Sequence, residues 1–348
     1  MEQYFHALIR GDRRGLGAAL QRGGLRLIGA AYGLGVRLRN WGFDRGWKRI
    51  AAAGVPVVSV GNLTLGGTGK TPCVEYVARY FREHDRRVAI LSRGYGVSQG
   101  CNDEALVLEE NLSDVPHLQG PDRVALAGVA IEELDSEVLV LDDGFQHRRL
   151  RRDLDLVLLD ATCPWGYGRL FPRGLLREPP RSLRRADVIL LTRCDQVEAD
   201  AVTRLKNEVR RWAGQTPIAE TTHDPAAWIN ANRRSAPLDA LAGRPVAGFC
   251  GLGNPDAFRR TLEGQDLKVI AWRTFADHHA YTRADIEELR SWARELPAGA
   301  FVATTQKDLV KIRLDRLADK ELWALQIRLN VRSGREELER KMSLVIGH

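Results

Sequence analysis

The sequence predicts an α/β protein with a P-loop-type, doubly wound, mainly parallel sheet, a second and smaller α/β domain, and an N-terminal amphipathic helix. Continuous apolar runs alternate with helical patterns, which is typical of strands buried on both faces. A glycine-rich turn with a Lys-Thr pair follows the first run. The net charge of +7 is concentrated in residues 1–50, which hold ten basic and three acidic residues. The expected segments are therefore a basic amphipathic segment 1–50, a nucleotide-binding core 51–225, a linker 226–243 and a small domain 244–348.

The N-terminal segment carries an apolar stripe at helical spacing. The stripe consists of Leu16, Leu20, Leu27, Ala31, Leu34, Leu38 and Trp41, and is widened by Leu25, Ile28 and Tyr32. Arg22, Arg26 and Arg37 gather on the opposite side of the helical wheel. A basic amphipathic helix of this kind lies in a lipid interface without spanning it. The alternative is a helix packed on the domain core with a solvated basic edge. No nucleic-acid partner is expected, because these residues lie on no recognised nucleic-acid module.

Residues 61–72 form the glycine-rich turn, directly after the apolar run 55–60. The residues expected to bind the nucleotide are Thr64, Leu65, Gly66, Gly67, Thr68, Gly69, Lys70 and Thr71. Glycines allow backbone N–H groups to close around phosphate oxygens, and the start of the following helix attracts the same anion. Lys70 can reach the β- and γ-phosphates, and the Thr71 hydroxyl can ligate Mg²⁺. Thr64 stands where the usual signature has glycine. The pattern predicts a site for a nucleoside triphosphate.

Further strands are expected at 88–91, 138–141, 156–160 and 188–192, with helices across 72–83 and 122–134. Asp142 and Asp143 end one of these strands, as a Walker-B carboxylate does where it supports Mg²⁺. A turn-capping role is the alternative for these two residues. Residues 192–195 (Thr-Arg-Cys-Asp) resemble the base-reading tetrapeptide of some P-loop proteins, with Arg in place of Lys. In the small domain, strands are expected at 245–250, 269–274 and 300–304.

Composition excludes several classes of protein. Five scattered cysteines without C-x-x-C spacing argue for a reducing compartment and against a disulfide framework or a zinc site. No apolar run approaches the length needed to span a bilayer, and no signal-peptide pattern is present.

Six motifs in order resemble the tetraacyldisaccharide 4′-kinase family, the lipid A 4′-kinases of Gram-negative bacteria. The motifs are 60–62 leading into 66–72, Leu91–Gly96, Asp142–His147, Leu176–Pro179, Phe275–His279 and Thr305–Asp308. The resemblance covers nearly the whole chain. It implies transfer of the γ-phosphoryl group of ATP, with Mg²⁺, to the 4′-hydroxyl of an acylated glucosamine disaccharide 1-phosphate, giving lipid IVA. It also implies peripheral attachment to the membrane surface at the cytoplasmic face of the bacterial inner membrane.

The resemblance also assigns roles to individual residues. It makes Lys70, Asp103 and His278 catalytic, with Asp103 orienting or deprotonating the sugar hydroxyl, paired with His278 across an interdomain cleft. His279 is the alternative to His278. Thr71, Asp142, Asp143 and Glu178 are the candidate metal ligands. The positions tied to the substrate or to phosphate are Arg93, Tyr95, Glu104, Arg123, Gln146, His147 and Arg177.

Two rival functions remain at this point. A P-loop GTPase-like switch or chaperone is supported by residues 192–195 alone. A soluble kinase for a small metabolite leaves the basic amphipathic N-terminus without a use. The position of His278 in the second domain favours transfer to an acceptor, because a switch needs only an ordered water.

Overall fold

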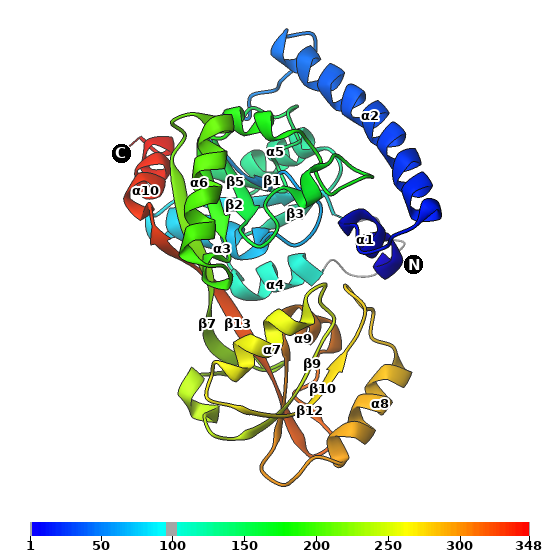
Figure 1. Cartoon of the computed structure of the whole chain (residues 1–348). Coiled ribbons are helices and arrows are strands. Elements are labelled where there is room, and N and C mark those ends of the chain that lie inside the picture. Colours follow the sequence, from blue (N-terminus) through cyan, green and yellow to red (C-terminus); the bar gives the residue numbers. More distant parts are fainter. Residues whose placement is uncertain (1, 95–102, 348) are drawn as a thin grey trace. The chain divides into compact units, whose positions relative to one another are not determined.

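A computed structural model describes residues 2–94 and 103–347 of the chain. The chain forms two compact units. Unit 1 comprises Met1–Arg93, Val115–Thr222 and Leu329–His348, and unit 2 comprises Gly94–Asp114 and His223–Arg328. Figure 1 traces the elements of both units along the sequence.

Unit 1 contains a parallel sheet whose strand order is β7-β6-β5-β1-β4-β2-β3. The strands are β1 (Val57–Asn62), β2 (Val88–Ser92), β3 (His117–Gln119), β4 (Val138–Asp142), β5 (Leu154–Asp160), β6 (Val188–Thr192) and β7 (Ile218–Ile229). Every residue of β1, β2, β4, β5 and β6 is buried, as expected for strands covered on both faces. The four predicted strands of the core are thereby confirmed.

Helices that follow the first strand cover both faces of this sheet. They are α3 (Lys70–Glu83), α5 (Arg123–Glu132), α6 (Ala199–Ala213) and α10 (Arg335–Val345). The chain moves outward from β1 to β2 through α3 and back from β3 to β4 through α5. Since crossovers are right-handed, α3 and α5 lie on opposite faces. The fold is doubly wound, as predicted.

Two helices precede the sheet, α1 (Glu2–Arg10) and α2 (Leu16–Asp44). Two glycines of α2, Gly29 and Gly33, are buried where the helix meets residues 170–173. A Cβ on Gly33 would lie 2.7 Å from Leu170 Cδ1, so this glycine allows close approach at that point. None of the helices in residues 2–94 and 103–347 is both long and apolar enough to cross a bilayer.

Unit 2 has a parallel sheet with the order β10-β9-β11-β13. Its strands are β8 (Ser235–Ala236), β9 (Pro245–Cys250), β10 (Lys268–Thr274), β11 (Phe301–Thr305), β12 (Arg316–Leu317) and β13 (Lys320–Ser333). Its helices are α4 (Asp103–Asn111), α7 (Pro255–Glu263), α8 (Arg283–Arg294) and α9 (Gln306–Ile312). This is the second α/β unit that the sequence predicts.

The boundaries of the units differ from the expected ones in three places. Helix α4 belongs to unit 2, because it packs against α9. Helix α10 belongs to unit 1, where Tyr76 of α3 donates a hydrogen bond to Glu339 (3.1 Å). Residues 226–243, expected as a linker, contribute the buried Trp228 and Leu241 to the core of unit 2. The long strands β7 and β13 each contribute residues to both units. The units are therefore built from several separate segments of the chain, and not from consecutive ones.

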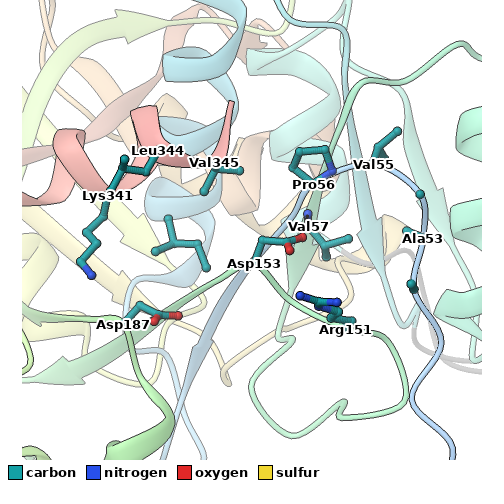
Figure 2. A pocket seen from close by; sticks show the side chains of 13 residues that line it. Ala53, Val55, Pro56, Val57, Arg151, Asp153, Asp187, Lys341, Leu344 and Val345 are labelled. Atoms are coloured by element: carbon teal, nitrogen blue, oxygen red, sulfur yellow. Dashed lines mark hydrogen bonds between the residues drawn. The ribbon is translucent and has the colours of Figure 1, made fainter. Parts of the chain in front are cut away.

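A hollow of about 500 Å³ lies in unit 1 at the amino ends of β1, β5 and β6. Figure 2 shows it lined by residues 52–57, the start of β5, Asp187 and the end of α10. Ligands of doubly wound sheets bind at the opposite, carboxyl ends of the strands. The predicted nucleotide-binding residues lie at that opposite edge.

Candidate functional site

The phosphate loop connects β1 to α3 in unit 1. Lys70 is the first residue of α3, and Gly69 before it is left-handed (φ 84°). Two side chains hold Thr68 within the loop: Asn62 Nδ2 donates to its hydroxyl (2.8 Å), and the Thr192 hydroxyl donates to its carbonyl (2.9 Å). The loop is thus held at Thr68, just before the helix whose N-terminus attracts anions.

Thr64 occupies the first position of the loop without backbone strain. Its φ lies outside the left-handed region, and it pairs with Leu176 in an isolated β-bridge. The neighbouring Leu65 donates its N–H to the Leu175 carbonyl (2.7 Å). Position 64 therefore does not require glycine. Gly66, with φ 104°, has a positive φ that favours glycine over other residues.

Asp143 lies between two cations at the mouth of the loop. Lys70 Nζ is 3.6 Å from its Oδ1, and Arg177 Nη1 donates to both carboxylate oxygens at 2.8 and 2.7 Å. Burial raises the pKa of Asp143, but Lys70, Arg177 and Arg123 outweigh burial and hold that pKa below its ordinary value. The carboxylate is ionised and keeps both cations in place.

Gln146 connects this group to β1. Its amide donates to the Asn62 carbonyl (3.0 Å), and its oxygen accepts from Arg177 (3.4 Å). The structure therefore brings together four residues that the sequence assigned to nucleotide, metal and substrate separately. They are Lys70, Asp143, Gln146 and Arg177.

The donors expected for Mg²⁺ fit a hard cation. Asp142 ends β4 directly beside Val60 of β1, and its carboxylate and the Thr71 hydroxyl are both buried. Within the described residues, no group of three or more His, Cys, Asp or Glu side chains could hold a metal by themselves. Mg²⁺ is ordinarily bound by one or two protein oxygens, substrate phosphates and water, and Thr71 with Asp142 or Asp143 can supply that part.

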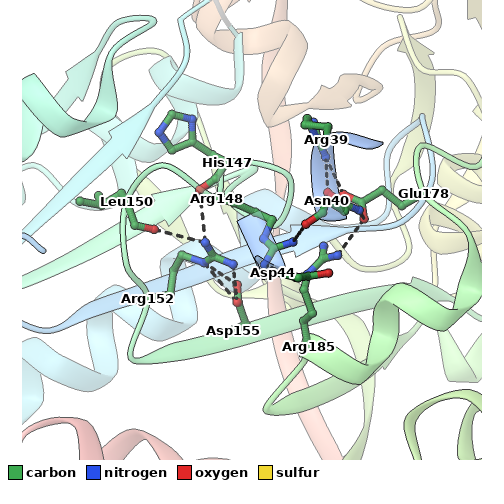
Figure 3. A network of polar contacts seen from close by, with 10 residues as sticks. All are labelled: Arg39, Asn40, Asp44, His147, Arg148, Leu150, Arg152, Asp155, Glu178 and Arg185. Atoms are coloured by element: carbon green, nitrogen blue, oxygen red, sulfur yellow. Dashed lines mark hydrogen bonds and ion pairs between the residues drawn. The ribbon is translucent and has the colours of Figure 1, made fainter. Parts of the chain in front are cut away.

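Glu178, which the sequence predicts as a metal ligand, has partners within the protein in this structure. It is fully buried, and Figure 3 shows its two oxygens engaged by three side chains. Arg39 and Asn40 of α2 donate at 3.0 and 2.8 Å, and Arg185 donates at 2.9 Å. Burial raises the pKa of Glu178, but Arg185 and the other donors hold it below its ordinary value. In this arrangement Glu178 anchors the C-terminal part of α2.

The remaining predicted substrate residues come from several segments of the chain. Arg123 is buried at the first turn of α5, and Arg93 is exposed after β2. His147 is partly buried; burial, followed by the charges of Arg123, Arg149 and Arg152, lowers its pKa to about 4. Its imidazole is neutral at neutral pH. Tyr95 lies outside the described residues. Glu104 belongs to unit 2, where it is paired with Lys307.

Arg193, from the tetrapeptide 192–195, serves the phosphate loop. Its backbone is left-handed (φ 56°), and its guanidinium donates to the Gly67 carbonyl (2.7 Å) while pairing with Asp160. The sequence pattern indicates only a reader of the nucleotide base for this segment. The signal that could have indicated its role was its position at the carboxyl end of β6.

Unit 2 contains the predicted pair of Asp103 and His278. His278 Nδ1 lies 3.0 and 3.2 Å from the two oxygens of Asp103, which is buried. The expectation that the pair joins two domains was wrong, because both residues belong to unit 2. Asp103 is the first described residue of α4, and α4 packs against α9 of the same unit.

Each partner changes the titration of the other. Burial raises the pKa of Asp103, but the hydrogen bond with His278 and the charges of Lys307, His278 and Lys311 outweigh it, so the pKa is lowered. The hydrogen bond with Asp103 raises the pKa of His278 despite partial burial. The pair is a carboxylate bonded to an imidazole poised to gain or release a proton.

His279 has a structural position. Its ring stacks on Phe275 with centroids 4.9 Å apart, and its Nε2 is 3.1 Å from Asp285. Asp285 completes the capping box of α8 with Thr282. His279 therefore supports the start of α8, whereas His278 faces Asp103.

These two groups of residues lie in a chain that a family model described as tetraacyldisaccharide-1-P 4′-kinase matches over residues 22–346. The chain belongs to this family. A tetraacyldisaccharide 4′-kinase from Anaeromyxobacter sp. strain Fw109-5 is 39% identical over 354 residues, covering 97% of this chain and 95% of the relative. One from Geobacter sulfurreducens is 37% identical, covering 93% and 94% respectively.

A solved structure gives the same result. LpxK from Aquifex aeolicus, crystallised in complex with ATP, is 31% identical and covers 93% of this chain and 99% of its own, with a TM-score of 0.76. The predicted family and fold class are confirmed. The match to the tetraacyldisaccharide-1-P 4′-kinase family includes both the phosphate loop and the part of the chain that carries His278.

Proposed function

We propose that this chain transfers the γ-phosphoryl group of ATP to the 4′-hydroxyl of a tetraacyldisaccharide 1-phosphate, giving lipid IVA. It is a phosphotransferase with an alcohol acceptor. The observation that carries the proposal is the group of Lys70, Asp143 and Arg177 at a phosphate loop, in a chain that the family matches over 22–346. ATP use is supported by the ATP complex of the Aquifex relative.

Unit 1 binds and polarises the nucleotide in this proposal. Backbone N–H groups of residues 66–69 and the start of α3 hold the phosphates, and Lys70 offsets charge on the group in transfer. Asp143 forms ion pairs with Lys70 and Arg177 in this structure, so bound phosphate would compete with the Asp143 carboxylate for both cations. Mg²⁺ held by Thr71 with Asp142 or Asp143 would add neutralising charge at the phosphate oxygens. Glu178 remains a candidate ligand; like Asp143, it would have to release side-chain partners to bind the ion.

Unit 2 handles the acceptor proton. The 4′-hydroxyl oxygen forms a bond to the γ-phosphorus as the bond from that phosphorus to the β,γ-bridging oxygen breaks, and ADP leaves. The hydroxyl proton passes to the Asp103–His278 pair, in which the Asp103 carboxylate is ionised and hydrogen-bonded to the imidazole in advance. Arg93, Tyr95, Glu104, Arg123, Gln146, His147 and Arg177 remain our candidates for contacts with substrate or phosphate.

A lipid bilayer is the proposed occupant of the exposed face of α2. Leu16, Leu20, Leu27, Leu34 and Leu38 are exposed along this helix, whereas the opposite stripe of Gly29, Gly33 and Val36 is buried. An acylated substrate keeps its chains in a membrane, so an enzyme that acts on its sugar gains by lying on that surface. Arginines of this helix that lie near the membrane surface would each strengthen binding to anionic lipid by about 1 kcal/mol. We place the protein at the cytoplasmic face of the inner membrane, where ATP is available.

Acceptor-dependent turnover tests the transfer reaction. ADP release from ATP and Mg²⁺ should be slow alone and strongly accelerated by tetraacyldisaccharide 1-phosphate, with one phosphate incorporated per ADP. Turnover that is fast without the acceptor would instead indicate a nucleotide-driven switch.

The roles of Asp103 and His278 need a separate test. Asp103→Ala and His278→Ala should each lower kcat far more than they weaken ATP binding, and the double variant should be little worse than either. Two large effects that simply add would leave both residues in the site but refute their joint action. His279→Ala is the matched control in the neighbouring position, and should retain most of the activity if its role is structural.

A further inference from the structure

Helix α9 directs two lysines at the first two residues of α4. Lys307 Nζ is 2.6 Å from Glu104 Oε1, and Lys311 Nζ is 3.6 Å from Asp103 Oδ2. The lysines are four residues apart, so they lie on one face of the helix. Lys307 belongs to the motif at 305–308, to which neither the sequence nor the proposed reaction gives a use.

A buried carboxylate fixes the position of Lys311. Asp308 is fully buried and accepts hydrogen bonds from the Gly251 N–H (3.1 Å), the Thr305 hydroxyl (2.7 Å) and the Tyr281 hydroxyl (3.0 Å). Its Oδ1 lies 3.3 Å from Lys311 Nζ. A buried charge is tolerated only with such compensation, so Asp308 must keep these hydrogen bonds and its ion pair with the ammonium.

The result is a chain of alternating charges that ends on the imidazole: Asp308, Lys311, Asp103, His278. The Lys311 ammonium also lies over the Tyr281 ring, 5.4 Å from its centroid, which restricts its movement. The charged groups around Asp103 come from three segments: Glu104 of α4, Asp277 and His278 after β10, and Lys307, Asp308 and Lys311 of α9. Among these charged groups, Lys307 and Lys311 are the cations that α9 places near Asp103.

Burial makes these cations necessary. Taking a carboxyl group out of water favours its protonated form, and a protonated Asp103 can accept no proton. Opposite charges within 4–6 Å reverse that preference. Lys311, 3.6 Å from Asp103, supplies such a charge, and the charge of Lys307 acts in the same direction. Both are independent of His278, so Asp103 stays ionised while the imidazole changes its own protonation state.

We propose that Lys307 and Lys311 are positioning residues which, with the buried Asp308, hold Asp103 as a carboxylate bonded to His278. The inference rests on the proposed function, in which this pair takes the acceptor proton. Neither lysine touches the reacting atoms in this proposal, because both act through Asp103.

The pH dependence of kcat tests the proposal with the acyl-disaccharide kinase assay. Lys311→Met keeps the length of the side chain and removes its charge, so the acid limb of the profile should move up by about one pH unit. Lys311→Arg should restore the position of that limb, and KM for ATP should change little. Lys268→Met, at an exposed position of β10 in the same unit, is the matched control and should leave the profile unchanged.

An NMR titration of His278 in the full chain separates this inference from the proposed function. Loss of either lysine should raise the pKa of His278, since a nearby positive charge is removed; Lys307→Met serves if Lys311→Met does not fold. Unchanged titration in both variants overturns the proposal. If the pKa of His278 shifts but the acid limb of the kcat profile does not move, the electrostatic effect of the lysines is supported. The Asp103–His278 pair is then refuted as the group that takes the proton.

Discussion

Removing leucines from the exposed face of α2 should release the protein from lipid without unfolding it. Leu27 and Leu38 are 76% and 57% exposed, so replacing them with serine removes little packing within the protein. Full burial of a leucine contributes about 1.5–3 kcal/mol, and partial immersion of these two contributes about 1–2 kcal/mol each. The double variant should therefore lose about 3 kcal/mol of membrane affinity, or about a hundredfold in partition coefficient.

The assay is sedimentation with vesicles of phosphatidylcholine containing phosphatidylglycerol, at low and high salt. Leu344→Ser is the matched control, because Leu344 of α10 is also 57% exposed and lies in another helix of unit 1. That control should bind vesicles like the unmodified chain, and high salt should weaken binding of both. If Leu27→Ser/Leu38→Ser sediments as fully as the control, α2 does not lie in the interface. Substitution is preferable to removing residues 1–40, since truncation would leave the buried Glu178 without Arg39 and Asn40.

Three further changes test other parts of the structure. Lys70→Ala removes the charge that offsets the transferring phosphoryl group and should lower the rate by at least about 10²-fold in the kinase assay; near-normal turnover would mean that the loop is misassigned. Glu178→Gln leaves Arg39 and Arg185 without a counter-charge and should cost about 3 kcal/mol by denaturant unfolding. Because the pKa of Glu178 is lowered on folding, its contribution is present above the ordinary pKa of 4.5 and is lost on acidification below it, so the variant should show a smaller acid-dependent loss of stability. Gly61→Ala would place a Cβ 2.6 Å from Phe145 Cβ and should cost about 1–3 kcal/mol, seen as a lower Tm, whereas Gly67→Ala, with open space around it, should leave Tm nearly unchanged.

The strand, loop and helix expected to bind the nucleotide could be predicted because their signals are local. The strand, the loop and the start of α3 follow one another within residues 57–83, and the spacing of glycine and lysine directly reflects backbone geometry. The five long buried strands were equally visible, because each is a continuous apolar run. Strand β3, with three residues, and the polar helix α4 carry no comparable pattern and were not predicted.

The uses of Glu178 and Arg193 could not be read from the sequence. Glu178 follows the loop that faces α2, and its partners Arg39 and Asn40 are 139 and 138 residues away. Arg193 contacts Gly67, 126 residues away. A motif shows that a charge is present at a strand end or in a loop, but its partner depends on the packing of other elements. The partners of both residues within the protein therefore could not be predicted from the motifs.

The expected cleft between Asp103 and His278 was wrong for a related reason. The chain leaves unit 1 after β2, contributes α4 to unit 2, and returns for β3. Sequence position alone placed Asp103 with the strands on either side of it, although 175 residues separate it from His278 and both lie in unit 2. The consequence is chemical as well as topological. Because α4, α9 and the turn after β10 all belong to one unit, the carboxylate, its two lysines and the imidazole keep their mutual geometry without help from the phosphate loop. The group proposed to accept the proton is thus preformed in unit 2, and the group proposed to bind the nucleotide is preformed in unit 1.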